Sequence, residues 1–231
     1  MDLAFLSAPS QCGYLPDRIW QLRHEFTPEM VAQEYMNRLR SGWRRFGPIL
    51  FRPECPSCRM CESLRIPVNG FRASRSQRRA WSRNDSEVRI EIGAPSSSPE
   101  KLDLFARFHQ HGRERKGWPA ENEPDLWVFL QNPFPTEEWC YYVDGRLIGV
   151  GYVDALLEGL SAIYFFHHPE ESRRSLGTFN ILSMIEAARK RGLPHVYLGY
   201  YVEGCRSLEY KARFRPNDVI GPAGEWKPFV R

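Results

Sequence analysis

Residues 138–153 place the strongest constraint on the fold of this chain. They read Glu-Trp-Cys-Tyr-Tyr-Val, then Asp144-Gly145, then Arg-Leu-Ile-Gly-Val-Gly-Tyr-Val. An Asp-Gly pair between two runs of apolar and aromatic residues is a strong signal for a β-hairpin, because both turn positions accept a positive φ. We therefore expect two antiparallel strands here, followed by a further strand over residues 160–166.

A helix is expected after this third strand. The loop at residues 173–178 leads into a segment whose apolar residues recur at helical spacing from Ile181 to Ala188, and Gly192 ends it. Residues 196–199 supply another strand. The order hairpin, strand, Arg/Gly loop, helix, strand is typical of an N-acetyltransferase-like (GNAT) core, in which the loop and the helix N-terminus receive a phosphate-bearing donor. We expect an α+β fold with this mixed-sheet core.

A smaller lobe is expected to precede this core. With 231 residues, the chain can form two closely apposed lobes. A Pro/Ser-rich joint at residues 94–99 marks the boundary, so we predict an N-terminal, cysteine-bearing lobe of residues 1–95 and a larger lobe of residues 96–231. Within the first lobe, Thr27 and the following proline signal a helix start, and residues 43–61 are rich in turns.

Four cysteines of the first lobe are candidate metal ligands. Cys55, Cys58 and Cys61 lie at two-residue gaps in the turn-rich segment, and Cys12 is the expected fourth member. Thiols at this spacing can converge on one zinc ion or iron-sulfur cluster. Free cysteines in a tight turn explain the same spacing, so both interpretations stay open. The other two cysteines are expected to be core thiols.

The charge and hydropathy of the chain are compatible with a polyanionic partner. The formal net charge is +4, and arginines are densest over residues 71–83. That stretch is either a solvated basic face or a binding surface. The apolar runs are too short to span a bilayer, and the first residues lack the basic and apolar regions of a secretion signal. We therefore expect a cytoplasmic protein without a membrane partner.

Two further features could carry chemistry. Asp154 ends an apolar strand beside Tyr152, where an aspartate serves either as a cap or as a proton acceptor. The segment Arg173-Arg174-Ser175-Leu176-Gly177-Thr178 precedes a helix whose first N–H groups favour an anion, although paired arginines before a helix are usually just surface. The chain has no nucleophile elbow, P-loop or dinucleotide-binding motif.

Motifs along nearly the whole chain resemble those of one known family. In the first lobe they are Cys12-Gly-Tyr-Leu-Pro16, Phe51-Arg-Pro-x-Cys-x-x-Cys-x-x-Cys61, Leu64-Arg-Ile-Pro-Val68 and Ser74-Arg-Ser-Gln-Arg-Arg79. In the second they are Leu160-Ser-Ala-Ile-Tyr164, Arg174-Ser-Leu-Gly-Thr-Phe179, Leu198-Gly-Tyr-Tyr201 and Cys205 through Tyr210-Lys211 to Arg215-Pro216. This ordered set resembles the arginyl-tRNA–protein transferase family, and in particular its bacterial aspartate/glutamate leucyltransferase branch.

The resemblance implies an aminoacyltransferase that moves leucine from leucyl-tRNA to the N-terminal amine of proteins beginning with Asp or Glu, which marks them for N-degron degradation. For that reaction we expect Asp154, with Tyr152 beside it, to orient or deprotonate the amine, and Arg75 and Arg78 to bind the acceptor's carboxylate. By motif or by family analogy, the donor-binding residues are Arg173, Arg174, Ser175, Gly177, Tyr201 and Lys211. No cofactor is required for the chemistry. Eukaryotic arginyl members resemble Cys-Gly-Tyr-Cys where this chain has Leu15, so their cluster ligands do not carry over intact.

Other functions are consistent with parts of the same sequence. An arginyltransferase would use the same acceptors, and the bacterial-style motifs favour leucine over arginine as the donated residue. The loop-and-helix pattern alone also permits an acetyl-CoA-dependent N-acetyltransferase. The cysteines and arginines alone permit a non-catalytic zinc-knuckle RNA-binding module, which leaves the second lobe unexplained.

Overall fold

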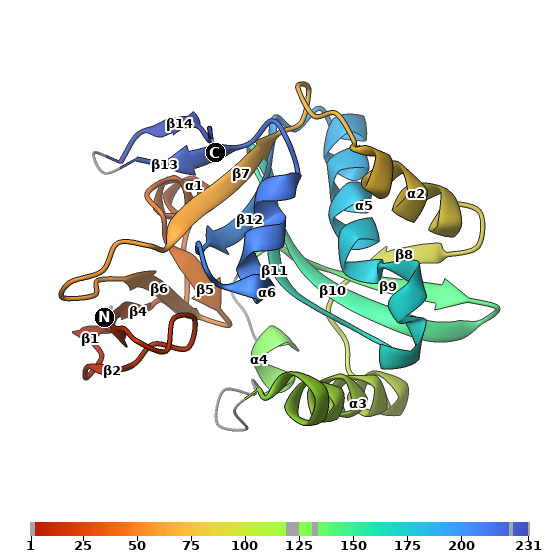
Figure 1. The fold of residues 1–231 in the computed structure, drawn as a ribbon, viewed down its shortest axis with the longest axis horizontal. Helices are drawn as coiled ribbons and strands as arrows, with labels where there is room; N and C mark the ends of the chain where they lie inside the picture. Colours follow the sequence, from red (N-terminus) through yellow and green to blue (C-terminus); the bar gives the residue numbers. More distant parts are fainter. Residues whose placement is uncertain (1–2, 119–124, 131–133, 222–223, 231) are drawn as a thin grey trace.

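An eight-stranded mixed sheet forms the centre of the molecule, which a computed structural model describes at residues 3–118, 125–130, 134–221 and 224–230 (Figure 1). Its strand order is β14-β13-β7-β12-β11-β10-β9-β8, and β11 with β12 is its parallel pair. The strands are β7 (Glu62–Pro67), β8 (Arg89–Gly93), β9 (Thr136–Val143), β10 (Arg146–Leu156), β11 (Gly159–His167), β12 (His195–Tyr201), β13 (Asp218–Ile220) and β14 (Trp226–Pro228). This mixed sheet confirms the α+β class.

A smaller antiparallel sheet, of order β1-β4-β6-β5, lies at the left of Figure 1 beside a short two-stranded ribbon, β2-β3. Its strands are β1 (Leu3–Leu6), β4 (Leu22–Phe26), β5 (Arg44–Phe46) and β6 (Ile49–Pro53), and the ribbon consists of β2 (Ser10–Gln11) and β3 (Ile19–Trp20). Helix α1 (Ala32–Arg40) buries Tyr35 and Leu39 in one cluster with Leu50, Leu156 and Tyr197. This cluster joins the smaller sheet to the larger one.

The hairpin predicted at residues 138–153 is confirmed by strands β9 and β10. Val143 pairs with Arg146, and the two turn residues, Asp144 and Gly145, have φ values of 49° and 79°. Positive φ at both positions is the geometry that an Asp-Gly turn supplies, and it matches the twist of the flanking strands. The next strand, β11, then pairs antiparallel with β10, as expected from its apolar run.

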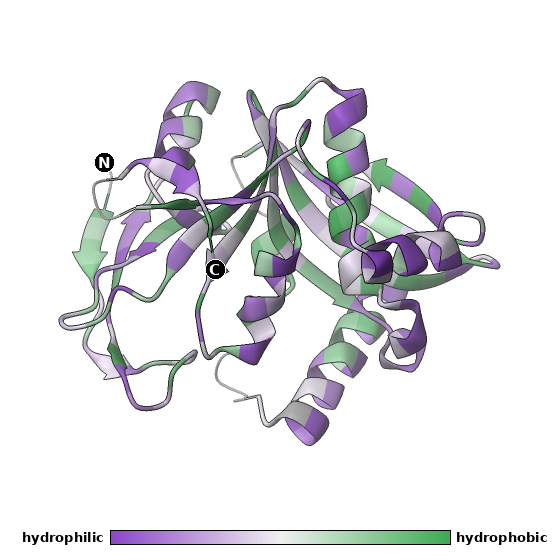
Figure 2. Cartoon of the chain, turned by 45° about the horizontal axis from the view of Figure 1, so that its top comes forward, coloured by the Kyte–Doolittle hydropathy of each residue, from purple (hydrophilic) through white to green (hydrophobic). Residues whose placement is uncertain are grey.

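Helices cover both faces of the large sheet (Figure 1). Helices α2 (Arg75–Asn84) and α5 (Leu176–Lys190) pack on one face, and α3 (Pro99–Lys116) with α4 (Trp127–Leu130) packs on the other. Because side chains alternate along a strand, Tyr141 of β9 joins the α5 side and the neighbouring Cys140 joins the α3 side. Figure 2 shows hydrophobic residues along the central strands and mixed hydropathy along the helices.

Local signals explain where α2 and α3 begin, whereas α1 begins at Ala32, later than the start predicted at Thr27, and has no side-chain cap. Ser74 caps α2 by accepting a hydrogen bond from the backbone N–H of Gln77, whose side chain accepts one from the N–H of Ser74. Ser98 caps α3 by accepting from the N–H of Lys101, with a proline in the first turn. Among the described helices, none combines the length and apolarity that crossing a bilayer requires.

The two sheets divide at a different place from the predicted lobe boundary. Strands β7 and β8 and helix α2 precede residue 95, yet β7 lies between β12 and β13, and β8 is the edge strand beside β9. Leu64 and Ile66 of β7 are fully buried in the main core. The division between sheets therefore falls between β6 and β7, and the Pro/Ser-rich joint at residues 94–99 only connects an edge strand to α3.

The parallel pair β11 and β12 opens toward its carboxyl end. Pairing runs from Gly159 with His195 to Ser161 with Tyr197, and no later pairs are formed between the described residues of these strands. On its other side, β12 continues to pair with β7, with a register shift before Gly199. The carboxyl end of a parallel strand pair is a common position for ligand sites.

Candidate functional site

A cavity of about 400 Å³ lies where β11 and β12 cease to pair. Its walls come from these two strands, the start of α5, and the turn formed by α6 (Arg206–Glu209) and η3 (Tyr210–Arg213). The lining includes Tyr164, Phe165, Gly177, Asn180, Ser207 and Lys211. We call it the strand cavity. Two of the predicted donor-binding residues, Gly177 and Lys211, meet here.

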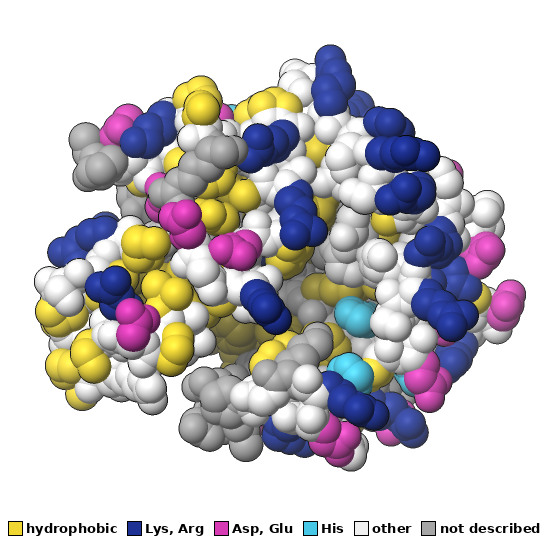
Figure 3. Space-filling model, viewed as in Figure 1, with side chains coloured by type: hydrophobic (Ala, Val, Ile, Leu, Met, Phe, Trp, Pro, Cys, Tyr) yellow, Lys and Arg dark blue, Asp and Glu magenta, His cyan; other side chains and the backbone are white. Residues whose placement is uncertain are grey.

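A larger cavity of about 580 Å³ adjoins the strand cavity and shares Trp118, Tyr164 and Ser207 with it. Aromatic side chains of the smaller sheet, including Phe46 and Phe51, form much of its wall, so we call it the aromatic cavity. Figure 3 shows the hollow between the N-terminal part at the left and the rest of the molecule. Among the described residues, no Asp or Glu lines either cavity.

Helix α5 begins at the strand cavity. Ser175 stands before its first turn with a φ of 55°, and the N–H groups of Thr178 and Phe179 bond to the carbonyl oxygen of Ser175. The N–H groups of the first helical residues, Leu176 and Gly177, precede these bonds and are available to an anion. The predicted placement of residues 175–177 at a helix start is therefore confirmed.

The two arginines before α5 differ in their surroundings. The side chain of Arg174 bonds to Glu87 at 2.7 Å and to Glu171 at 2.9 Å, and these partners raise its pKa. That guanidinium is held in the protein's own ion pairs. Arg173 is exposed at the end of the short helix η2 (Pro169–Arg174). Of the two, Arg173 is the one with an exposed side chain beside the helix start.

Lys211 lies close to a buried arginine that the sequence did not reveal. Its ammonium donates to the carbonyl oxygen of Tyr200 at 2.9 Å. Burial, followed by the charge of Arg44, lowers the pKa of Lys211 to about 7. Arg44 donates from Nη1 to the carbonyl oxygens of Leu39 and Trp43, whereas its Nε and Nη2 have no hydrogen-bond partner among the described residues. In the sequence, Arg44 and Arg45 are two consecutive arginines in a turn-rich segment, and that pattern does not predict that either side chain is buried.

Tyr201 lines neither cavity, whereas its neighbour Tyr200 lines the aromatic cavity. Tyr201 packs in the main core and contacts the ring of Phe229. Tyr200 lines the aromatic cavity. Adjacent residues of a strand point to opposite faces, so the two tyrosines cannot share a surface. The family motif contains both, and only the alternation of β12 could have distinguished them.

Asp154 is enclosed by three hydrogen-bonding side chains. Arg45 donates from Nε at 2.6 Å, the hydroxyl of Tyr35 donates at 2.5 Å, and that of Thr136 donates at 2.8 Å. Arg45 also contacts the other carboxylate oxygen, and Asp154 has no exposed surface. It lines neither cavity. All three donors come from the protein itself, and the carboxylate of Asp154 is not exposed to either cavity.

Tyr152 is equally enclosed. Its hydroxyl donates to Glu138 at 3.2 Å, and its ring stacks on Phe129 with centroids 4.8 Å apart. Burial and Glu138 raise the pKa of the phenol well above its usual range. Tyr152 therefore has the surroundings of a core residue, and the predicted pair of catalytic groups at the end of β10 is not brought to the cleft.

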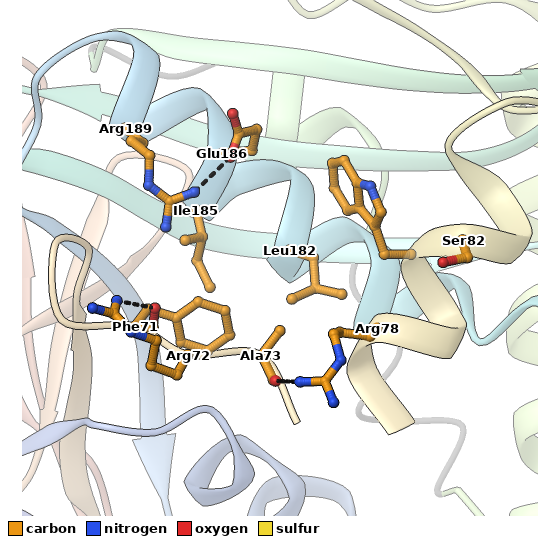
Figure 4. Close-up of a pocket in the computed structure, with 10 residues that line it drawn as sticks. Phe71, Arg72, Ala73, Arg78, Ser82, Leu182, Ile185, Glu186 and Arg189 are labelled. Carbon is orange, nitrogen blue, oxygen red and sulfur yellow. Dashed lines mark hydrogen bonds and ion pairs between the residues drawn. The ribbon is translucent and has the colours of Figure 1, made fainter. Parts of the chain in front are cut away.

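Arg75 and Arg78 are exposed on α2 and line neither the strand cavity nor the aromatic cavity. Arg78 lines a separate cavity of about 350 Å³ between α2 and α5, together with Trp81 and Leu182, and its Nη1 donates to the carbonyl oxygen of Ala73 at 2.6 Å. Figure 4 shows Arg78 at the α2 wall of this cavity. The structure does not bring Arg75 and Arg78 together with Gly177 and Lys211.

The four predicted metal ligands are neighbours without forming a closed ligand set. Burial raises the pKa of the Cys61 thiol to about 12, and the charges of Cys55, Cys12 and Cys58 add to this effect. Within the described ranges, no three His, Cys, Asp or Glu side chains are placed to hold one metal ion. The donor set suits zinc or an iron-sulfur cluster in chemistry, and the observed arrangement does not complete a coordination sphere.

The surroundings of Cys12 are those of a hydrogen-bonded sulfur. Its Sγ accepts from the backbone N–H groups of Tyr14 at 3.4 Å and Leu15 at 3.5 Å. Bonds of this kind stabilise a thiolate and tune sulfur ligands in metal centres. Leu15 itself packs in a small apolar cluster with Cys61 and Cys205.

Known protein families and curated relatives match nearly the whole chain. A family described as arginine-tRNA-protein transferase, N terminus, matches residues 10–79, and its C-terminus counterpart matches residues 100–221. The aspartate/glutamate leucyltransferase of Campylobacter jejuni subsp. jejuni serotype O:23/36 (strain 81-176) is 35% identical over 228 residues, 95% of this chain and 93% of that protein. The enzyme of the same name from Brucella ovis is 38% identical over 242 residues, 97% of this chain and 95% of that protein.

A solved structure has a related fold. The C-terminal domain (DUF2156) of a putative lysylphosphatidylglycerol synthetase from Agrobacterium fabrum aligns with a TM-score of 0.50 and 14% identity, covering 73% of this chain and 58% of that chain. At this identity the likeness concerns the fold alone. The two matched family regions and the near full-length relatives show that the chain belongs to the arginine-tRNA-protein transferase family.

Proposed function

We propose that the protein transfers leucine from leucyl-tRNA to the N-terminal α-amine of proteins that begin with Asp or Glu, marking them for N-degron degradation in the cytoplasm. The observation that carries the proposal is the pair of joined cavities at the opening between β11 and β12, in a chain whose near full-length relatives are named aspartate/glutamate leucyltransferases. We further propose that the opened parallel pair with a helix starting beside it corresponds to the donor site of an acetyltransferase-like core.

The composition of the cavity walls favours leucine over arginine as the donated residue. The aromatic cavity is lined by apolar rings such as those of Phe46 and Phe51, and no described lining residue of either cavity is Asp or Glu. An arginyl side chain held there would lose its hydration without gaining a carboxylate partner, which is costly. A leucyl side chain gains from burial against the same surface.

The donor's phosphate and ribose are assigned to the start of α5. An anion there would meet the N–H groups of Leu176 and Gly177, with the exposed Arg173 close by in sequence. Ser175 is the residue directly before Leu176 and Gly177. Tyr164 lies between the strand cavity and the aromatic cavity, so an aminoacyl ester that spans both would pass it.

The transfer itself needs little acid-base assistance. The acceptor's α-amine has a pKa of about 7.7 to 8.0, so a usable fraction is neutral at pH 7. The neutral amine attacks the ester carbonyl, a new amide C–N bond forms, the ester C–O bond breaks, and the tRNA ribose hydroxyl leaves with a proton. The chain contributes the positioning of the amine and the ester.

The body of the tRNA is assigned to α2. This helix carries Arg75, Arg78, Arg79 and Arg83 and no acidic residue. Figure 3 shows Lys and Arg side chains along the upper right of the molecule, where Figure 1 places α2. A row of exposed guanidinium groups outside the reaction cleft suits a nucleic-acid backbone better than a single acceptor carboxylate.

A metal or cluster on Cys12, Cys55, Cys58 and Cys61 remains part of the proposal. The support is the chemistry of the donor set and the hydrogen-bonded sulfur of Cys12. When bound, such a centre would tie the β2-β3 ribbon to the segment between β6 and β7. It takes no part in the transfer steps.

The deciding experiment offers the purified protein leucyl-, phenylalanyl- and arginyl-tRNA, and separately acetyl-CoA, with a peptide that begins with Asp. We expect transfer from leucyl-tRNA, weaker use of arginyl-tRNA and none of acetyl-CoA. Transfer from acetyl-CoA without tRNA would replace the proposal by an N-acetyltransferase. Equal use of arginyl-tRNA would contradict the assignment of the aromatic cavity to the leucyl side chain.

A further inference from the structure

Two basic side chains meet beside Gly199 on β12. A Cβ atom at this position would lie 3.7 Å from the ammonium nitrogen of Lys211 and 3.8 Å from Nε of Arg44. Gly199 has a φ of 77° and follows a register shift in the pairing of β12 with β7. This backbone conformation favours glycine, so no native side chain stands between the cation from β5 and the cation from η3.

Neither cation has an acidic partner among the described residues. The side chains whose electrostatic interaction shifts the pKa of Lys211 are Arg44 and the thiol of Cys205. Those that shift the pKa of Arg44 in this way are tyrosines. Arg44 is 5% exposed, and its Nε and Nη2 have no hydrogen-bond partner within the described part of the chain. Buried charges in proteins are normally paired. Two neighbouring cations without an acid therefore point to an anion that comes from outside.

We propose that Lys211 and Arg44 bind the side-chain carboxylate of the acceptor's first residue and so select Asp and Glu. Lys211, which lines the strand cavity, makes the direct contact. Arg44 stands behind Gly199 and adds its charge and its unpaired N–H groups. The inference rests on the proposed transfer reaction and assigns its acceptor specificity to residues other than Arg75 and Arg78.

The size of the site favours a carboxylate over a tRNA phosphate. Arg44 is buried and lines neither cavity, whereas Lys211 lines the strand cavity, so the proposed carboxylate meets Lys211 first. A phosphodiester carries a ribose on each side and is better suited to the open start of α5. A carboxylate at the end of a short side chain needs no such room, and its amine then lies in the same strand cavity as Gly177.

The test compares Lys211→Met with Lys211→Arg and with the control Lys227→Met, which removes an exposed lysine on β14. Met removes a desolvated ammonium without adding a polar group, so the variant is expected to fold. The readouts are kcat/KM for peptides that begin with Asp or Asn, direct binding of both peptides, and the Kd for leucyl-tRNA. Arg44→Lys and Arg44→Met repeat the comparison at the buried site.

We expect Lys211→Met to reduce the preference for the Asp peptide over the Asn peptide by about tenfold to a hundredfold, the effect of losing one charged hydrogen bond. The Kd for leucyl-tRNA should not change, and Lys211→Arg should restore most of the preference. An unchanged preference with weaker tRNA binding would assign the pair to a donor phosphate and overturn the inference. So would wild-type protein that binds both peptides equally well. Peptide binding is measured without tRNA, so it stays informative even if no transfer is detected.

Discussion

Arg45 and Asp154 join the two sheets through a buried ion pair, with Nε of Arg45 donating to a carboxylate oxygen of Asp154 at 2.6 Å. Arg45 lies on β5 of the smaller sheet, and Asp154 lies near the end of β10 in the larger one. Tyr35 of α1 donates to the same carboxylate. The carboxylate that the sequence suggested for proton transfer is therefore paired with an arginine of the smaller sheet, and it lines neither cavity.

Asp154→Asn should lower the free energy of unfolding by about 3–5 kcal/mol, because it leaves the Arg45 guanidinium buried without its partner. Urea denaturation of the purified variant measures this loss. The matched control is Asp103→Asn, which breaks the exposed pair of Arg107 with Asp103 and should cost less than about 1 kcal/mol. An Asp154→Asn protein of wild-type stability but without transfer activity would return Asp154 to the mechanism.

The preference for acidic acceptors should weaken as the pH rises through about 7. Burial and Arg44 lower the pKa of Lys211 to about 7, with the Cys205 thiol opposing them, so the lysine is charged below this pH and neutral above it. The carboxylate needs the charged form, whereas the amine needs to lose its proton. We expect kcat/KM for an Asp peptide to fall on the alkaline side, and kcat/KM for an Asn peptide to keep rising. Lys211→Arg should remove the alkaline fall.

Binding of tRNA should depend on salt through α2. Removing Arg75 and Arg79 together should weaken binding, and it should reduce the slope of log K against log salt by about one for each phosphate that the helix no longer binds. Fluorescence anisotropy with labelled leucyl-tRNA at several salt concentrations measures the slope. Arg107→Ala on α3, across the sheet from α2, is the control and should leave it unchanged. The preference for Asp over Asn peptides should stay as in the wild type, and a loss of it would return this helix to the acceptor.

A carboxylate placed in the aromatic cavity should shift the choice of donor. Ile49 lines this cavity at the start of β6 and is 39% exposed, so Ile49→Asp is expected to fold. The new carboxylate disfavours burial of a leucyl side chain and can pair with an arginyl one. The ratio of arginyl to leucyl transfer should therefore rise by about tenfold. Ile92→Asp on the edge strand β8 is the control, being 46% exposed and outside both cavities. An unchanged ratio in Ile49→Asp would place the donated side chain elsewhere.

The cysteine cluster should carry metal when the protein is purified without oxygen. We expect zinc or iron in elemental analysis and a loss of most of it in Cys58→Ser, because thiolates are the ligands that both centres require. Cys140→Ser is the control, since Cys140 is a core thiol on the α3 side of the sheet. Protein purified in this way that contains neither zinc nor iron and is as stable as the Cys140→Ser control would remove the centre from the proposal.

Local signals predicted the parts of the fold that local chemistry determines. The Asp144-Gly145 turn identified the hairpin, and Ser98 identified the start of α3. The position of β7 could not be predicted in this way, because its partners β12 and β13 lie far along the chain and strand pairing leaves no local mark. Family motifs placed Gly177 and Lys211 in one predicted site, and both residues do line the strand cavity.

The same limit applies to the site. Asp154 looked available because nothing in the sequence shows that Arg45 and Tyr35 reach it from other elements. The meeting of Arg44 with Lys211 depends on a register shift beside Gly199, and such a shift is set by the sheet as a whole. Burial and cross-strand proximity are properties of the folded chain, and residue type alone does not report them.

The insertion of β7 between β12 and β13 also bears on how the protein is made. During synthesis β7 leaves the ribosome early, while both of its neighbours emerge near the end of the chain. Its buried residues Leu64 and Ile66 must stay unpaired until then. The nascent N-terminal segment therefore carries an apolar strand whose hydrogen-bonding partners do not exist until the last part of the chain has been made.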